Sequence, residues 1–95
     1  MEINISSNNV TIEGNIKSIN DFQKIKTLLD QTIIEHKSIV LNIVNSISIT
    51  SSVIGYLNKL VLKDGINIKM IVGDSQLLEL LDDLDLISTF NAKLS

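Results

Sequence analysis

Near the start of the chain, apolar and polar residues alternate. Every second position is apolar in two short stretches, at Ile3, Ile5, Val10 and Ile12. This period of two is typical of strands that bury one face. The stretches are separated by Asn8-Asn9, and asparagine tolerates the positive φ of a tight turn. The pattern predicts a β-hairpin over residues 2 to 13 that ends at Gly14-Asn15.

A helical pattern follows Ser18. Apolar residues recur at steps of three and four, which places them on one stripe of a helix, at Ile19, Phe22, Ile25, Leu29 and Ile33. Ser18 can cap the first turn, because Asp21 lies three residues later in the capping-box position. His36 and Lys37 lie near the other end, where the helix dipole favours cations. We expect a helix over residues 19 to 36.

The run from Ile39 to Val44 is almost continuously apolar and rich in β-branched residues. Such a short run predicts a strand at the centre of a sheet, covered on both faces. A polar loop follows from Asn45 to Ser52, and it ends in the hydroxyl cluster Thr50-Ser51-Ser52.

The second half of the chain predicts two helices around another strand. The expected elements are a helix over Val53 to Lys63, a strand over Ile66 to Val72 and a helix over Gln76 to Leu84. The helical positions expected to face the core are Ile54, Leu57, Leu60 and Val61, then Leu77, Leu78, Leu81 and Leu84. Gly65 is suited to a left-handed C-cap. In the tail, we expect a short strand around Ile87 to Phe90.

These elements follow the order ββαβαβα. Strand–helix–strand units with short loops imply parallel strands and right-handed connections. We therefore expect an α/β fold (α+β by stricter criteria, because of the hairpin) with a mixed sheet of about four to five strands and three main helices. At 95 residues the chain has room for one core, so we expect a single domain over residues 1–95.

Composition excludes several kinds of site. The chain has no Cys and one His, so thiol nucleophiles, thiolate metal ligands and His-rich zinc sites are absent. Its eight basic residues are all Lys and its net charge is −3, which gives nucleic acids little attraction and no bidentate Arg contact. No apolar run approaches the roughly 20 residues of a membrane span. We expect a cytoplasmic protein, monomeric when free, with no cofactor, no metal, no nucleic-acid partner and no membrane insertion.

Two groups of polar side chains have simpler structural explanations than function. The acidic cluster of Glu79, Asp82, Asp83 and Asp85 has the chemistry of a hard-metal site or an acid–base pair. Its spacing matches no calcium loop, so a solvated helix end is the favoured interpretation. His36 has the chemistry of a general base or a phosphorylated histidine, but a capping role at the helix end is favoured.

The loop from Ser46 to Ser52 is the strongest functional candidate. Its hydroxyls lie between a predicted central strand and a predicted helix. Functional groups gather at the carboxyl ends of strands in open α/β sheets, and a helix N-terminus tolerates a phosphate or carboxylate. The structural alternative is N-capping by Ser51 or Thr50.

At this loop the chain resembles the anti-sigma-factor antagonists, the bacterial STAS family. In that family a hydrophobic strand leads into an Asp-Ser-Ser-Gly-Leu-Gly turn that opens a helix. Three stretches of this chain carry the resemblance in the family's order: Ile12-Glu13-Gly14-Asn15-Ile16, then Leu41-Asn42-Ile43 with the turn Thr50-Ser51-Ser52-Val53-Ile54-Gly55, and finally Leu80 to Ile87 with Phe90. The similarity covers roughly residues 9 to 91.

The resemblance implies a regulator without catalytic activity. Members of the family are phosphorylated by a partner serine kinase that is itself an anti-sigma factor, and a PP2C-type phosphatase reverses the modification. The unmodified form binds the kinase and releases its other client. By position, the resemblance implies Ser52 as the phospho-acceptor, Ser51 as second choice, and a partner-binding surface formed by Thr50, Ser51, Ser52, Val53 and Tyr56.

Two positions depart from the family turn, since Thr50 replaces its Asp and Val53 replaces the Gly after the acceptor. Two hypotheses remain open. The chain is either a partner-switching protein controlled at Ser52, or a STAS-type accessory subunit that docks constitutively on a transporter ATPase or a sensory complex. The departures favour constitutive docking, and the surviving Ser51-Ser52 pair favours the switch.

Overall fold

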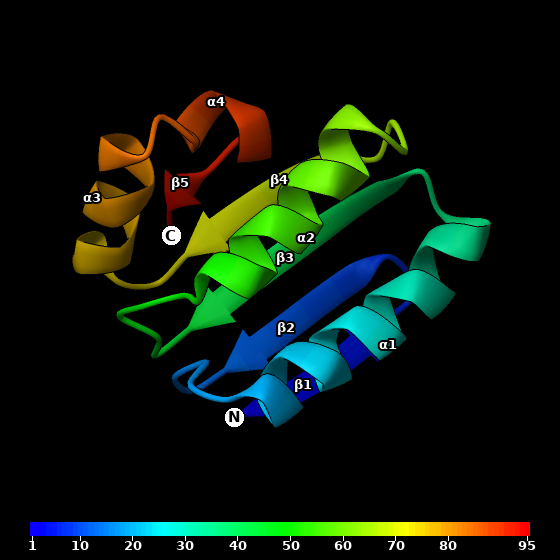
Figure 1. Ribbon diagram of the computed structural model, residues 1–95, viewed down its shortest axis with the longest axis horizontal. Helices are drawn as coiled ribbons and strands as arrows, with labels where there is room; N and C mark the ends of the chain where they lie inside the picture. The colour runs from blue at the N-terminus through cyan, green and yellow to red at the C-terminus, as the bar shows by residue number, and fades with distance from the viewer.

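The computed structural model describes residues 1–95, and it confirms the predicted α/β class (Figure 1). The elements in chain order are β1 (Glu2–Ser6), β2 (Asn9–Glu13), α1 (Ile19–Glu35), β3 (Ser38–Val44), α2 (Ser51–Leu62), β4 (Asn67–Val72), α3 (Ser75–Asp83), α4 (Ile87–Phe90) and β5 (Lys93–Leu94). None of the helices has the length and apolar character needed to span a bilayer.

The five strands form one mixed sheet in the order β1-β2-β3-β4-β5. β1 pairs antiparallel with β2, and every later pair is parallel. Parallel strands are joined by right-handed crossovers, so a strand order that never reverses puts every crossover helix on the same face of the sheet. Figure 1 shows α1 and α2 crossing that face.

The central strand β3 is therefore covered on one face only, and the prediction that it is covered on both was wrong. Its residues alternate: Ile39, Leu41 and Ile43 are at most 1% exposed, whereas Val40 and Asn42 are half-buried. Val44, the last residue, is 36% exposed. The run looked continuous because valine occupies two positions on the uncovered face.

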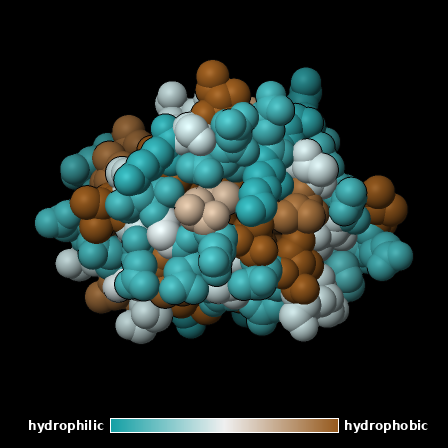
Figure 2. All heavy atoms as spheres, turned by 90° about the horizontal axis from the view of Figure 1, so that it is seen from below, coloured by the Kyte–Doolittle hydropathy of each residue, from teal (hydrophilic) through white to brown (hydrophobic).

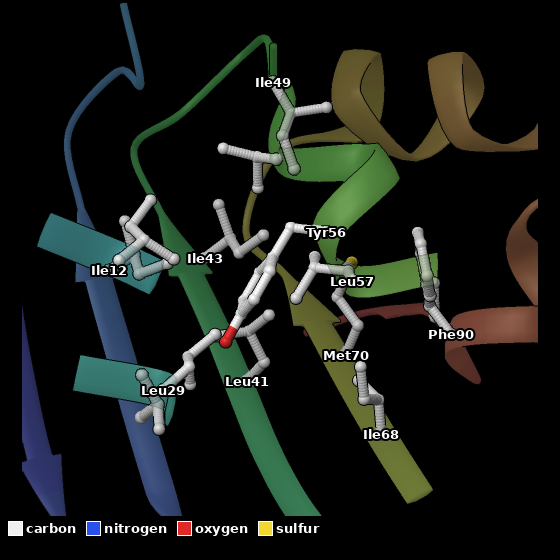
Figure 3. Close-up of a cluster of buried hydrophobic side chains, with 14 of the residues drawn as sticks. Ile12, Leu29, Leu41, Ile43, Ile49, Tyr56, Leu57, Ile68, Met70 and Phe90 are labelled. Carbon is white, nitrogen blue, oxygen red and sulfur yellow. The ribbon is translucent and has the colours of Figure 1, made fainter. Parts of the chain in front are cut away.

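The core lies between the sheet and the helices. It is a single cluster of 22 buried residues, drawn from every helix and from β2, β3 and β4. Figure 3 shows Tyr56 and Leu57 of α2 among the strand residues Leu41, Ile43 and Met70. The packing is almost entirely aliphatic, with Phe90 and Tyr56 as the buried aromatic residues.

The predicted hairpin forms, but its turn lies one residue earlier than expected. Ser6 pairs with Asn9, so the two turn residues are Ser7 and Asn8. Ser7 has a φ of 58°, and Asn8 is not in the positive region. Asn8 instead uses its side-chain amide to donate a 2.9 Å hydrogen bond to the carbonyl of Ser38. This contact fixes Asn8 as a turn residue and leaves Asn9 to begin β2.

Ser7→Gly is expected to stabilise the protein. A positive φ at the first of two turn residues is the arrangement of a type II′ turn, which favours Gly there. A non-Gly residue in the left-handed region costs about 1–2 kcal/mol, and the greater freedom of Gly in the unfolded chain offsets part of the gain. We expect a net increase of about 0.5 kcal/mol in the free energy of unfolding, measured by urea denaturation. An unchanged or lower urea midpoint would contradict this account of the turn.

The ends of α1 and α2 follow the predicted chemistry. The Asp21 amide donates to the Ser18 hydroxyl at 3.1 Å, and the Asp21 carboxylate accepts from the Lys17 amide at 3.0 Å. Beyond α2, Gly65 has a φ of 67°, and the Ile66 amide donates back to the Leu60 carbonyl at 2.9 Å, so the left-handed glycine lets the chain reverse and satisfy a carbonyl of the last turns of the helix. Both signals are local, which is why the sequence indicates them clearly.

Two residues assigned to buried helix faces are exposed. Ile19, the first residue of α1, is 76% exposed, and the first buried residue of this helix is Ile25. Leu84 is 48% exposed because α3 ends at Asp83, where the chain turns away. Of the remaining predicted positions, the fully buried ones are Ile25, Leu29, Leu57, Leu60, Leu77 and Leu81.

The tail differs from the prediction, because Ile87–Phe90 is the short helix α4 and the last strand is Lys93–Leu94. Leu86 and Phe90 are 9% and 0% exposed and lie four residues apart, so one helical turn directs both toward the core. Asn91, with a φ of 47°, ends this turn in the left-handed region and donates its side-chain amide to the Ile68 carbonyl at 2.9 Å.

Candidate functional site

Three loops meet at the edge of the sheet where β2, β3 and β4 end. The Gly14 amide donates to the Val44 carbonyl and the Gly73 amide to the Ile43 carbonyl, each at 2.9 Å. The Ile47 amide donates to Asn15 Oδ1 at 3.1 Å. A hydrogen bond therefore joins the loop that carries the hydroxyl cluster to the loop that precedes α1.

The hydroxyl loop is anchored from within. Ser46 is fully buried and donates its hydroxyl to the Ser48 carbonyl at 2.8 Å, while Ile49 is inserted into the core with 8% exposure. Thr50 caps α2 by accepting a 3.3 Å hydrogen bond from the Val53 amide. The helix begins at Ser51, two residues before the predicted start, so Thr50 rather than Ser51 is the capping residue.

Ser51 and Ser52 are both exposed in the first turn of α2. Ser52 also lines a small hollow of about 130 Å³ between the starts of α1 and α2. The other residues of the hollow are Lys17, Ser18, Ile19, Phe22 and Thr50. Ser52 is thus exposed beside a hollow that Lys17 also lines.

Val53 and Tyr56 lie beneath this surface rather than on it. Their side chains are 1% and 6% exposed and belong to the core cluster. Neither side chain is exposed on the surface of this chain, and their assignment to the partner-binding surface stays a prediction. Ser51 and Ser52 are the accessible members of the predicted set, with Thr50 half-buried beside them.

A polar cluster between α1 and α2 was not predicted from the sequence. The Tyr56 hydroxyl donates to the Asp30 carboxylate, which also accepts from Lys26 Nζ at 3.0 Å. The rings of Phe22 and Tyr56 meet edge to face with centroids 6.2 Å apart. The spacing of Lys26 and Asp30 by four residues was a visible helix signal, but nothing local indicates that Tyr56 joins them.

The cluster shifts two ionisation equilibria. Partial burial acts to raise the pKa of Asp30, but hydrogen bonds from Tyr56 and Lys26 outweigh it, so the pKa lies below its usual value. Burial, together with donation to Asp30, raises the pKa of Tyr56 far above its usual value. At neutral pH the phenol is protonated and the carboxylate is charged, so the hydrogen bond from Tyr56 to Asp30 links α2 to α1.

Tyr56→Phe is expected to lower the free energy of unfolding at pH 7 by about 1 kcal/mol. A hydrogen bond to a charged group contributes about 1.5–3 kcal/mol, and we expect less here because the Asp30 side chain is 42% exposed to water. Folding lowers the pKa of the Asp30 carboxyl, so its charge stabilises the folded protein at pH values above the pKa of the unfolded chain. This stabilisation is lost as the pH falls through the lower pKa of the folded protein. The difference between variant and wild type should therefore shrink below about pH 4. Urea denaturation at pH 7 and pH 2.5 tests this, and an equal difference at both pH values would refute it.

The other candidate groups do not assemble into a site. No three of Glu79, Asp82, Asp83 and Asp85 converge in a group that could hold a metal ion. His36 is half-buried at the end of α1, where its backbone amide donates to the Thr32 carbonyl at 3.1 Å. Its position is that of the C-cap, as the structural interpretation predicted.

We compared the chain with known proteins in three ways, and no family model, no curated protein and no solved structure matches it. The structure itself establishes an α/β fold with a mixed five-stranded sheet.

Proposed function

We propose that this chain is a cytoplasmic, non-catalytic interaction module resembling an anti-sigma-factor antagonist, and that phosphorylation of Ser52 switches its partner binding. The observation that carries the proposal is the exposed Ser52 hydroxyl in the first turn of α2, directly after the loop that leaves the central strand. The proposed partners are a serine kinase that is also an anti-sigma factor and a PP2C-type phosphatase.

The two departures from the family turn are compatible with this switch. Thr50 provides the N-cap, and threonine and aspartate are both established capping residues. Val53 points into the core with 1% exposure, so its branched side chain does not crowd Ser52 on the surface. The replacements are therefore compatible with a capped turn and an exposed serine.

The electrostatics of the site also support a switch that leaves the fold unchanged. Phosphoserine carries about −1.5 to −2 charges, and an anion at the first turn of a helix is favoured by about 0.3–1 kcal/mol. Lys17 lines the same hollow as Ser52. The protein tolerates the added charge, whereas an apolar or acidic partner surface would not, so the effect of phosphorylation falls on binding.

The alternative is constitutive docking on a transporter ATPase or a sensory complex. Exposed apolar side chains near the site favour a protein partner in either case, since Ile19 and Ile47 are 76% and 51% exposed at the two loops that meet there. The two functions differ in whether Ser52 is modified.

The deciding experiment is phosphorylation in vitro with an anti-sigma-type serine kinase from the same organism, followed by mass spectrometry. We expect phosphate on Ser52 of the wild type, none at this site in Ser52→Ala, and retained incorporation in the matched control Ser51→Ala. Ser51 and Ser52 are neighbouring exposed serines, so the pair controls for local access. Phosphate on Ser51 alone would refute the register, and no incorporation into the folded protein would favour constitutive docking.

A further inference from the structure

The face of the sheet opposite the helices has an unusual environment for parallel strands. Sheets built of parallel strands are nearly always covered on both faces, but here all crossover helices share one face. Half-buried apolar and polar side chains form the middle of the open face, with Thr11 on β2, Val40 and Asn42 on β3, and Ile71 on β4. A shallow hollow of about 440 Å³ lies on the side of this face formed by β3, β4 and β5, and it is lined by Val40, Lys69, Ile71, Asn91 and Lys93.

Charge is distributed on this face in two separate groups. The five strands contain four charged residues, Glu2, Glu13, Lys69 and Lys93, and the alternation of each strand places all four on the open face. Glu2 lies directly opposite Glu13 in the β1–β2 register, and like charges at such positions repel. Lys69 lies on β4, two residues from Ile71, the residue that pairs with Lys93 on β5.

Nothing within the chain neutralises these charges. The two ion pairs of the structure are Lys26–Asp30 and Lys59–Asp64, and both lie among the helices and their connections. The open face therefore has an acidic side at β1–β2 and a basic side at β4–β5, with uncharged residues between. An acidic partner would offer opposite charge only to the basic side, whereas a second copy of the same face offers opposite charge to both sides.

We infer that the open face is a self-association surface on which two copies of this chain stack face to face. A two-fold axis that lies between the stacked sheets and runs roughly along the strands places β1–β2 of one copy over β4–β5 of the other. In the registers of the sheet, Glu2 and Glu13 are level with Val44, whereas Lys93 is level with Asn42 and Lys69 with Val40. The Glu2 and Glu13 side chains of each copy then approach Lys93 of its partner across an offset of two residues, and Lys69 lies two residues farther along the strand. Val40 and Ile71 occupy the uncharged centre of the contact. This inference departs from the expectation that the free chain is a monomer.

The size of the face sets the strength of the dimer. With strands about 4.8 Å apart and about 3.3 Å of rise per residue, the face covers roughly 350 Å² per copy, less than half of the roughly 800 Å² that a stable interface buries per partner. We therefore expect a weak, reversible dimer that forms with rising concentration and weakens with salt. The site at Ser52 lies at the carboxyl edge on the helical side, so this inference is independent of the proposed function.

Charge exchange provides the test. Sedimentation velocity of the wild type from about 10 µM to about 1 mM should show the apparent mass rising from 10.5 kDa toward twice that value at low salt. The double variants K69E/K93E and E2K/E13K should each remain monomeric. An equimolar mixture of the two should associate at least as strongly as the wild type, because an all-acidic face then meets an all-basic one.

The control is K24E/K63E, which changes the net charge as much as K69E/K93E does but alters exposed lysines on α1 and just after α2. It should associate like the wild type, and circular dichroism with thermal melting should verify that every variant is folded. A wild type that stays monomeric throughout the concentration range would overturn the inference. So would a control that dissociates equally, or a mixture that fails to associate although both variants are folded.

Discussion

Leu57→Ala is expected to lower the free energy of unfolding by about 2–5 kcal/mol, the usual range for removing a large buried aliphatic side chain. Leu57 is fully buried on the sheet side of α2, and Figure 3 shows it between Tyr56 and Met70. The loss combines the transfer free energy of the removed methyl groups with the cost of the cavity that remains. A domain of this size has a total stability of about 5–15 kcal/mol, so the expected loss is a large fraction of the total.

The same helix provides a matched control. Leu62 is 74% exposed at the last turn of α2, so Leu62→Ala should change the free energy of unfolding by at most about 0.5 kcal/mol. The helix α1 offers a second pair, with Ile25 fully buried and Ile34 77% exposed. Urea denaturation compares the two members of each pair, in which the same residue type is replaced by alanine at a buried and at an exposed position. Equal losses for Leu57→Ala and Leu62→Ala would mean that the face of α2 that packs on the sheet is assigned wrongly.

The helix–sheet order was predictable because its signals are local or periodic. The Ser18–Asp21 cap needs residues three apart, and the Gly65 C-cap needs a single residue with a φ of 67°. The open face was not predicted, because Val40 and Val44 filled positions where a polar residue would have revealed the alternation. Between the two ends of β3, Asn42 was the one polar residue on that face. Its side-chain amide donates a 2.6 Å hydrogen bond to Asn9 Oδ1.

The candidate site was predictable in position but not in its internal roles. The apolar run before the hydroxyl cluster indicated the end of a central strand, and this is where Ser52 lies. The choice between Thr50 and Ser51 as the cap depends on where the first helical turn begins, and three consecutive hydroxyl residues leave that undetermined. The contact between Tyr56 and Asp30 joins residues 26 positions apart and arises only when α1 and α2 pack together.

Under the proposed switch, Ser52→Asp is expected to weaken binding to the anti-sigma-type kinase by about tenfold or more, which corresponds to about 1.4 kcal/mol. A carboxylate carries roughly half the charge of a phosphate, so the effect of the phosphorylated protein should be larger. The melting temperature should remain within about 2 °C of the wild type, because a negative charge at a helix N-terminus is tolerated. Titration calorimetry measures the affinity, and thermal melting separates loss of binding from loss of folding.

Two matched variants make the result specific. Ser52→Asn changes the side chain to a similar size without charge, so it should retain most of the affinity if charge is the cause. Ser51→Asp adds the same charge one residue earlier, in the same turn but outside the residues that line the hollow beside Lys17. It should weaken binding less than Ser52→Asp, because the proposed switch depends on a charge at the hollow that Ser52 lines, and Ser51 does not line it. Wild-type affinity for Ser52→Asp and for the phosphorylated protein would refute the switch and leave constitutive docking as the function of the module.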